Sequence, residues 1–192
     1  MNFALSRRAA DLREFWRIEV IRKDNFSWRR VMTNMANNRR RNFIFWWRLA
    51  SEMYEHGTKR ERKAASRLND KLKERFATDI ELGARIGPGF HISHHAGLVI
   101  SKKARIGRNF IIRQNTTIGS RQGLSDDEVI TIGDNVDVGA NSCIIGAVTI
   151  GDNVTLGAMS FVNKDIPSNS VYITRKTSTT TITPAGLGGK TE

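Results

Sequence analysis

The sequence has one cysteine, four histidines and no long apolar run, and each shortage excludes a class of protein. The single thiol, Cys143, rules out an intramolecular disulfide framework, and no histidine motif surrounds it that would make it a nucleophile. The run FIFWW, at Phe43 to Trp47, is far shorter than the ~20 apolar residues of a transmembrane helix. The opening residues, MNFALSRRAADLREF, lack the apolar core and cleavage site of a secretory signal. We therefore expect a folded cytoplasmic protein without a transmembrane helix.

Acidic residues are also scarce, and the excess of basic residues is confined to one part of the chain. The 31 Lys and Arg and 19 Asp and Glu give a net charge of +12. Residues 1–79 hold 20 basic and 10 acidic residues, which leaves 11 and 9 for residues 80–192. Such a basic segment fits a solvated helical face, contact with an anionic membrane surface, or nucleic-acid binding. No nucleic-acid-binding motif accompanies the charge, so we expect no nucleic-acid partner and allow peripheral contact at the inner face of the membrane.

The first part of the chain has a helical pattern. Ala, Leu, Glu, Lys and Arg are abundant up to about Phe76, and the apolar residues Phe45, Leu49 and Met53 recur at helical spacing. Gly57 marks the expected break between two helices.

From Ile80 onward the pattern changes to aliphatic anchors at steps of six residues. The anchors fall in three runs: Ile80, Ile86 and Ile92; then Ile100, Ile106, Ile112 and Ile118; then Ile132, Val138, Ile144, Ile150, Leu156 and Val162. The residue two positions before each anchor is small or apolar, as in a strand whose alternate side chains face one side. Glycine follows seven of the thirteen anchors, where we expect it to relieve a tight corner.

This period predicts a mainly β fold, a parallel β-helix of three short strands per turn with an α-helical segment before it. We divide the chain into a basic helical segment at 1–77, a β-helix at 78–170, and a partly disordered tail at 171–192. An irregular β-sandwich with alternating strands would require hairpin turns every ~8–12 residues and no fixed period.

Two departures from the period predict the position of a functional site. The step from Ile92 to Ile100 is eight residues and contains His94 and His95. The step from Ile118 to Ile132 is fourteen residues and contains the polar run SRQGLSDDEV, which should project from the coil.

The runs DIELGARIGPGFHISHHAGLVISKKARIG and VGANSCIIGAVTIGDNVTLGAMSFVNKDIP resemble serine acetyltransferases and, more closely, the colanic acid and exopolysaccharide acetyltransferases. The resemblance covers roughly residues 78–167 and implies a left-handed β-helix that transfers an acetyl group from acetyl-CoA. It implies a general base at His94 and an orienting carboxylate at Asp79, fifteen residues earlier. A carboxylate on the far ring nitrogen fixes the imidazole tautomer and stabilises the imidazolium formed on proton transfer.

The same resemblance implies an acetyl-CoA site between adjacent subunits of a homotrimer or a dimer of trimers. The matching positions of this chain are Gly119, Ala140, Ala158 and Lys164. Small residues let the pantetheine arm approach the backbone, and a lysine suits a phosphate.

On the acceptor side the sequence departs from serine acetyltransferases. They have Asp before the catalytic His and an Arg-His pair in the projecting loop, whereas this chain has Ser93 and only Arg121. We therefore expect a sugar hydroxyl of a capsule or exopolysaccharide precursor as the acceptor, with serine as the alternative.

Two readings from other classes stay open. A β-helix scaffold could bind anionic polymers without catalysis. A zinc hydro-lyase similar to γ-class carbonic anhydrases would need three well-separated His ligands, but three of the four histidines crowd one corner, so we expect no metal.

Overall fold

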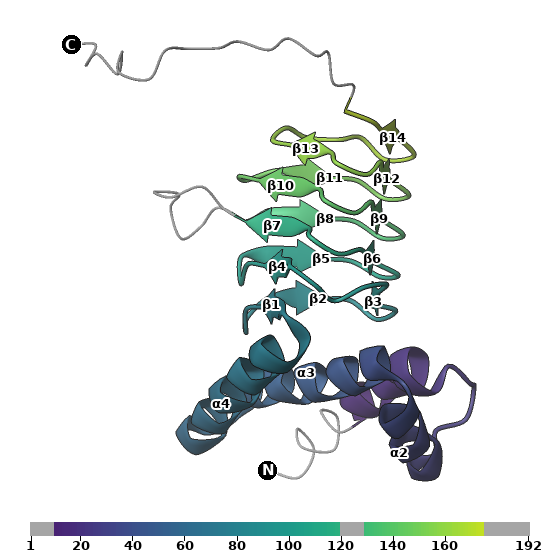
Figure 1. The fold of residues 1–192 in the computed structure, drawn as a ribbon, viewed down its shortest axis with the longest axis vertical. Coiled ribbons are helices and arrows are strands. Elements are labelled where there is room, and N and C mark those ends of the chain that lie inside the picture. The colour runs from purple at the N-terminus through teal and green to yellow at the C-terminus, as the bar shows by residue number, and fades with distance from the viewer. Residues whose placement is uncertain (1–9, 120–128, 175–192) are drawn as a thin grey trace, which may run out of the picture.

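The computed structural model describes residues 10–119 and 129–174. A helical layer lies across one end of a column of stacked coils (Figure 1). Residues 10–16 are helical and continue into the π-helix η1 (Arg17–Ile21). The helices α2 (Trp28–Asn37), α3 (Arg39–His56) and α4 (Lys59–Phe76) follow. Among the described residues, no helix is both long and apolar enough to cross a membrane.

Local sequence signals fix the ends of α3 and α4. The side chain of Asn38 accepts a hydrogen bond from the Arg41 N–H and caps the start of α3, which ends at Gly57 as the sequence predicts. Thr58 and Glu61 form a reciprocal capping box at the start of α4.

The coil consists of three parallel sheets that the chain visits in turn. Sheet A contains β1 (Thr78–Ile80), β4 (Leu98–Ile100), β7 (Thr117–Gly119), β10 (Cys143–Ile145) and β13 (Phe161–Val162). Sheet B contains β2 (Arg85–Ile86), β5 (Ala104–Ile106), β8 (Ile130–Ile132) and β11 (Thr149–Ile150). Sheet C contains β3 (His91–Ile92), β6 (Ile111–Ile112), β9 (Asp137–Val138), β12 (Thr155–Leu156) and β14 (Val171–Tyr172). The segment assigned to the tail therefore begins with one more strand of sheet C.

The six-residue pattern of the sequence corresponds to the core. All thirteen anchors are at most 6% exposed, and the residue two positions before each of them is buried as well. Stacked anchors pair in register between coils, for example Ile92 with Ile112 and Ile112 with Val138. The period predicted from the sequence is confirmed over its whole length.

Glycine is required after the anchors for a different reason from the tight corner that the sequence suggested. Most of these glycines have an ordinary φ, so they do not relieve a strained corner. A Cβ on Gly87 would instead lie 2.6 Å from the carbonyl oxygen of Gly107 in the next coil. Glycine is required there because stacked coils approach each other closely.

Asparagine, and not glycine, takes most of the left-handed corner positions. Asn109, Asn135, Asn153 and Asn169 have φ between 55° and 60°, and each amide donates to the next at 2.9 Å. Asn115 and Asn141 form a second, shorter ladder at the corner between sheets C and A. These ladders hold the corners of successive coils in register.

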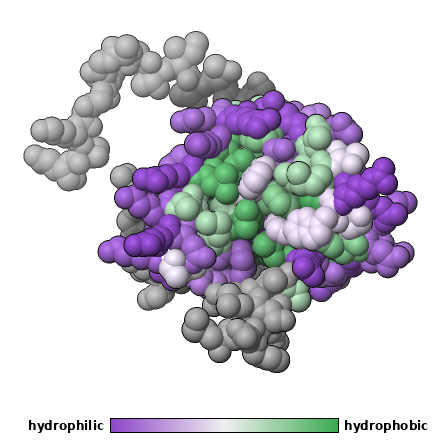
Figure 2. All heavy atoms as spheres, turned by 90° about the horizontal axis from the view of Figure 1, so that it is seen from below, coloured by the Kyte–Doolittle hydropathy of each residue, from purple (hydrophilic) through white to green (hydrophobic). Residues whose placement is uncertain are grey.

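The helical layer shares its core with the first coils. Phe43, Trp47 and Phe76 are fully buried in the cluster that also contains Phe90 and the anchors. On the outer side of the layer, hydrophobic residues gather in the middle of the face and hydrophilic ones surround them (Figure 2).

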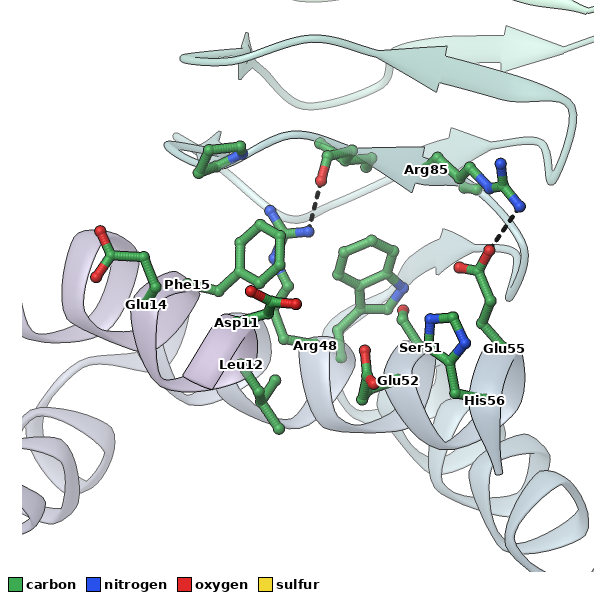
Figure 3. Close-up of a pocket in the computed structure, with 14 residues that line it drawn as sticks. Asp11, Leu12, Glu14, Phe15, Arg48, Ser51, Glu52, Glu55, His56 and Arg85 are labelled. Carbon is green, nitrogen blue, oxygen red and sulfur yellow. Dashed lines mark hydrogen bonds and ion pairs between the residues drawn. The ribbon is translucent and has the colours of Figure 1, made fainter. Parts of the chain in front are cut away.

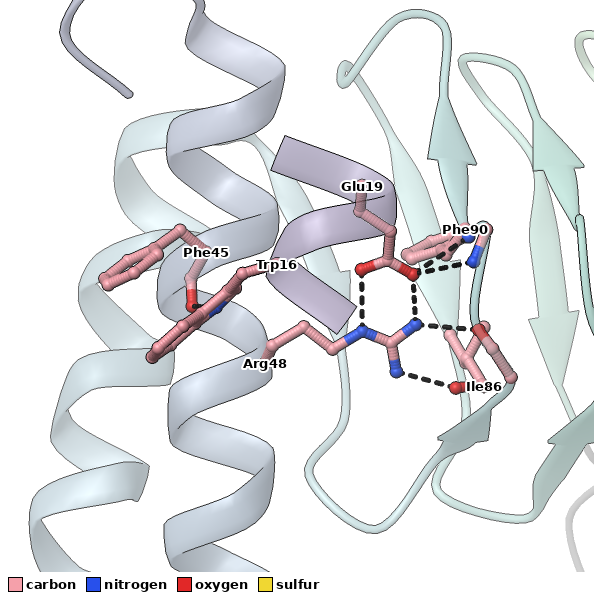
Figure 4. Close-up of polar contacts among 8 residues, drawn as sticks. Trp16, Glu19, Phe45, Arg48, Ile86 and Phe90 are labelled. Atoms are coloured by element: carbon pink, nitrogen blue, oxygen red, sulfur yellow. Dashed lines mark hydrogen bonds and ion pairs between the residues drawn. The ribbon is translucent and has the colours of Figure 1, made fainter. Parts of the chain in front are cut away.

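Two polar side chains lock the layer to the coil (Figure 4). Arg48 of α3 forms a two-pronged pair with Glu19 of η1, at 2.6 and 2.9 Å, and both side chains are buried. The guanidinium also donates to the carbonyls of Ile86 and Gly87, and Glu19 accepts the N–H groups of Gly89 and Phe90. The pair thus connects η1, α3 and the first turn of the coil.

Close coil stacking gives a stability test with a matched control. A Cβ on Gly139 would overlap backbone atoms of Gly157 and Ala158, whereas one on Gly157 would meet its nearest atom, the Tyr172 carbonyl oxygen, at 3.5 Å. We expect Gly139→Ala to lower the free energy of unfolding by about 1–3 kcal/mol, as overpacking does. Gly157→Ala should change it by less than about 1 kcal/mol. Urea denaturation of both variants measures the difference, and equal losses would contradict this account of the glycines.

Candidate active site

The sequence-predicted histidine lies at a widened corner between sheets C and A. The Ser93 N–H donates to the Ile112 carbonyl, as in a regular coil, and regular pairing resumes where the Asn115 N–H donates to Ala96. The two extra residues of the eight-residue step are therefore His94 and His95. His94 is exposed and makes no hydrogen bond or ion pair to any described residue.

The corner is fixed to the start of the coil by two bonds. The Gly97 N–H donates to the Ala77 carbonyl at 2.9 Å, and the Thr78 hydroxyl donates to the His95 carbonyl at 2.8 Å. A hollow around His94 is lined by the start of α3, the end of α4 and the corner itself: Arg39, Arg40, Phe76, Ala77, Ser93, His95 and Ala96. His94 is thus an accessible imidazole on an ordered support.

His95 is a packing residue, although it is adjacent in the chain. Its ring is 8% exposed and lies against Phe43 and Phe76, with centroids 4.9 and 5.2 Å away. Its Nδ1 lies 3.2 Å from the Thr78 hydroxyl. Burial, assisted by the charges of Arg39 and Arg40, lowers the pKa of His95 to about 4. The ring is therefore neutral at physiological pH and serves to hold the corner.

Asp79, expected to orient His94, points to a different partner in this structure. It lies on β1 beside Val99, and Lys73 of α4 forms an ion pair with it at 2.8 Å. No hydrogen bond to His94 is formed. The pair with Lys73 is partly exposed, and such pairs contribute little stability, so the carboxylate is free to exchange partners.

The four positions expected to contact acetyl-CoA lie on two different edges of the coil. Ala140 and Ala158 follow strands of sheet C and stand above the corner of His94, where Met159 N–H donates to the Ala140 carbonyl. Gly119 is the last residue of β7 and Lys164 follows β13, so both lie at the opposite end of the strands of sheet A. One chain therefore does not bring all four together. The small side chains of Ala140 and Ala158 leave room for a narrow chain along the upper part of that edge.

Two wall elements of the site were not predicted from the sequence. Gln114 occupies the edge position between Ala96 and Ala140, directly above the widened corner, and could have been found by its place two residues after Ile112. Arg39 and Arg40 line the hollow because the start of α3 packs beside the widened corner, and this contact between distant segments is indicated by no local sequence signal.

Some expected features fall elsewhere. Arg121 and the segment at 120–128, which the sequence predicts to project from the coil, lie outside the described residues, as does the chain after 174. Among the residues that the structure describes, no group of three His, Cys, Asp or Glu side chains could hold a metal ion.

A second hollow lies between the first helical residues, α3 and β2 (Figure 3). Phe15, Trp47 and Arg48 form one part of it, and the ion pair of Glu55 with Arg85, at 2.6 Å, closes another. His94 does not line this hollow.

Comparison with known proteins gives a consistent match. Residues 129–164 match the family model described as the hexapeptide repeat of succinyl-transferase. The chain is 41% identical over 116 residues to chloroplastic serine acetyltransferase 1 of Arabidopsis thaliana, covering 60% of this chain and 37% of that protein. It is 34% identical over 109 residues to the serine acetyltransferase of Helicobacter pylori, covering 56% of this chain and 64% of that one. The chain thus spans from about a third to less than two thirds of the length of these relatives.

Solved structures match over more of the chain. Soybean serine acetyltransferase complexed with serine aligns with a TM-score of 0.67 and 29% identity, over 88% of this chain and 66% of that one. Serine acetyltransferase isoform 3 of Entamoeba histolytica, in complex with cysteine, aligns with a TM-score of 0.70 and 22% identity, over 94% and 62%. The predicted fold class, a left-handed parallel β-helix behind an α-helical segment, is confirmed by these matches.

Burial of His95 predicts a loss of stability in mild acid. Its pKa is lower in the folded chain than in the unfolded one, so its contribution is complete above the unfolded value of about 6.5 and is lost as pH falls toward about 4. Between pH 7.5 and 5 we expect this histidine alone to remove about 2 kcal/mol of unfolding free energy. In His95→Phe that part of the pH dependence should disappear. Urea denaturation at both pH values tests this, and an unchanged slope in the variant would contradict it.

Proposed function

We propose that this chain is an acetyl-CoA-dependent O-acetyltransferase in which His94 is the general base, and that serine is its acceptor. The observation that carries the proposal is the accessible imidazole of His94, which has no polar partner among the described residues, at a widened and ordered corner. The matched relatives and solved structures named as serine acetyltransferases support the reaction and the acceptor.

The chemistry requires one proton to move twice. Acetyl-CoA supplies an acetyl group on a thioester. His94 takes the proton of the acceptor hydroxyl as its oxygen bonds to the acetyl carbon, and the imidazolium returns a proton to the departing sulfur. Asp79 would have to leave Lys73 to orient the ring, since a carboxylate on the far nitrogen stabilises the imidazolium. We assign it that orienting role.

A sugar hydroxyl is the second candidate acceptor. The sequence-based preference for an exopolysaccharide acceptor has no support in the comparisons, which favour serine. One feature of the site still favours it: the described lining of the hollow contains two arginines and no carboxylate to bind the ammonium group of serine. Ser93 occupies the position before His94 where serine acetyltransferases have Asp.

The test is release of the CoA thiol from acetyl-CoA with L-serine, neutral sugars and nucleotide sugars as acceptors. We expect turnover with serine, and loss of about 10²-fold or more in kcat for His94→Ala with acetyl-CoA affinity retained. Asp79→Asn should have an intermediate kcat, while Lys73→Met should not lower it, because it only frees Asp79. His56→Ala, at the far end of α3, is the control.

Two results would overturn parts of the proposal. Turnover with sugars but not with serine would replace the acceptor. Near wild-type kcat in a folded His94→Ala protein would remove the general base.

The division of the acetyl-CoA positions between two edges leads to a proposal on assembly. If one pantetheine arm contacts Ala140 and Ala158 as well as Gly119 and Lys164, the two pairs must come from adjacent chains. We therefore expect a homotrimer, in which Lys164→Glu weakens acetyl-CoA binding without changing assembly. Light scattering of the purified protein measures the mass, and a stable monomer with full acetyl-CoA affinity would contradict this arrangement.

A further inference from the structure

Three arginines and a histidine gather where η1, α3 and β3 meet. Arg22 follows η1, Arg40 and Arg41 lie in the first turn of α3, and His91 projects outward from β3. Together with Glu19 and Asn38 they line one small pocket. Arg40 lines both this pocket and the hollow of His94, so the two are adjacent.

The carboxylates near this cluster are already bound by groups outside it. Glu19 lies in the pocket wall, but it is bound by Arg48 and by the N–H groups of Gly89 and Phe90. Asp137, which lies two coils beyond His91 on sheet C, is paired with Arg113. Three guanidinium charges therefore face one another without a free counter-ion among the described residues.

The contacts of His91 show that the cluster has more hydrogen-bond donors than acceptors. Arg22 Nη2 lies 2.7 Å from Nδ1 of His91, and Arg40 Nη1 lies 2.9 Å from its Nε2. A neutral imidazole has one acceptor nitrogen, so only one of these contacts can be a hydrogen bond, and the other opposes two N–H donors. Burial and the Arg41 and Arg40 charges lower the pKa of Arg22. Burial, together with Arg22 and Arg40, lowers that of His91.

We propose that Arg22, Arg40, Arg41 and His91 form a binding site for a phosphate group. Guanidinium groups bind phosphate oxygens with two parallel hydrogen bonds, and an imidazole N–H adds a further donor. Such an anion accepts from all donors that now oppose one another. The N-terminus of α3, where Arg40 and Arg41 lie, adds partial positive charge of the same sign.

Phosphate fits the cluster better than a carboxylate does. A phosphate monoester carries up to two negative charges and has three terminal oxygens, which suits three arginines. The carboxylate of serine lies a few bonds from its hydroxyl, whereas His91 and His94 are three residues apart, a span of up to ~10 Å along an extended chain. A phosphorylated or nucleotide-linked acceptor could place its phosphate on the cluster and a hydroxyl at His94. This placement rests on the proposed acetyl transfer at His94 and on its second candidate acceptor, a sugar hydroxyl, while the binding site itself rests on neither.

The first experiment measures binding of inorganic phosphate, with no acetyl donor present. Calorimetry and thermal unfolding are carried out in low-salt buffer on the wild type, Arg22→Gln, Arg40→Gln and the control Arg60→Gln on the outer part of α4. We expect phosphate to bind and to raise the Tm of the wild type and Arg60→Gln. Arg22→Gln and Arg40→Gln should each bind phosphate at least about tenfold more weakly than the wild type.

Stability without phosphate separates ligand binding from a structural role. Removing one of three mutually repelling charges should leave the Tm of Arg22→Gln unchanged or higher in phosphate-free buffer. A lowered Tm in that buffer, or equal phosphate affinity in the cluster variants and the wild type, would overturn the site.

A second arm identifies the source of the phosphate. Thiol release is compared with glucose and glucose 1-phosphate as acceptors in the wild type and Arg22→Gln. An advantage of the phosphorylated sugar that Arg22→Gln abolishes assigns the site to the acceptor. Phosphate binding without that advantage assigns it to a free anion. Absence of thiol release with any acceptor, together with phosphate binding, would overturn the proposed function and leave the site intact.

Discussion

The buried pair of Glu19 and Arg48 determines how the helical layer sits on the coil. Its six hydrogen bonds join η1 and α3 to each other and to the first turn of the coil, away from water. Such a pair adds little net stability compared with apolar residues of the same size, but loss of one partner leaves a buried charge. The role of the pair is to fix one position of the helical layer on the coil among the many that apolar contacts alone would allow. The walls of the His94 hollow and of the arginine cluster both come from elements placed by this pair.

The coil supplies the other half of the site by a different physical principle. Regular stacking makes every corner equivalent, so a functional group must come from a departure from the repeat. Two extra residues between Ser93 and Ala96 produce that departure. One of them, His95, turns inward between two phenylalanines, and this packing leaves its neighbour His94 on the outside. The accessible imidazole of His94 thus arises from one interruption of the repeat.

Regular features could be predicted from the sequence, and features that depend on packing between elements could not. The thirteen anchors, the break at Gly57 and the position of His94 follow from spacing alone, because period and interruption are local properties. The prediction that the glycines relieve tight corners was wrong, because the distance between stacked coils cannot be read from the sequence. Arg40 and Arg41 entered the sequence analysis only as part of the basic segment at 1–79. The contact of Arg40 with His91 depends on how α3 is placed against β3, and the ion pair of Asp79 with Lys73 depends likewise on where α4 ends.

The asparagine ladders carry a consequence for how such a chain can change in length. Each ladder joins residues that occupy the same corner of successive coils, so duplication of three consecutive hexapeptides would extend a ladder by one step and keep all faces aligned. Duplication of a single hexapeptide would move every later residue to the next face, and the small-residue edge above His94 would lose its continuity. Insertions that keep the three faces aligned therefore add whole turns of three hexapeptides.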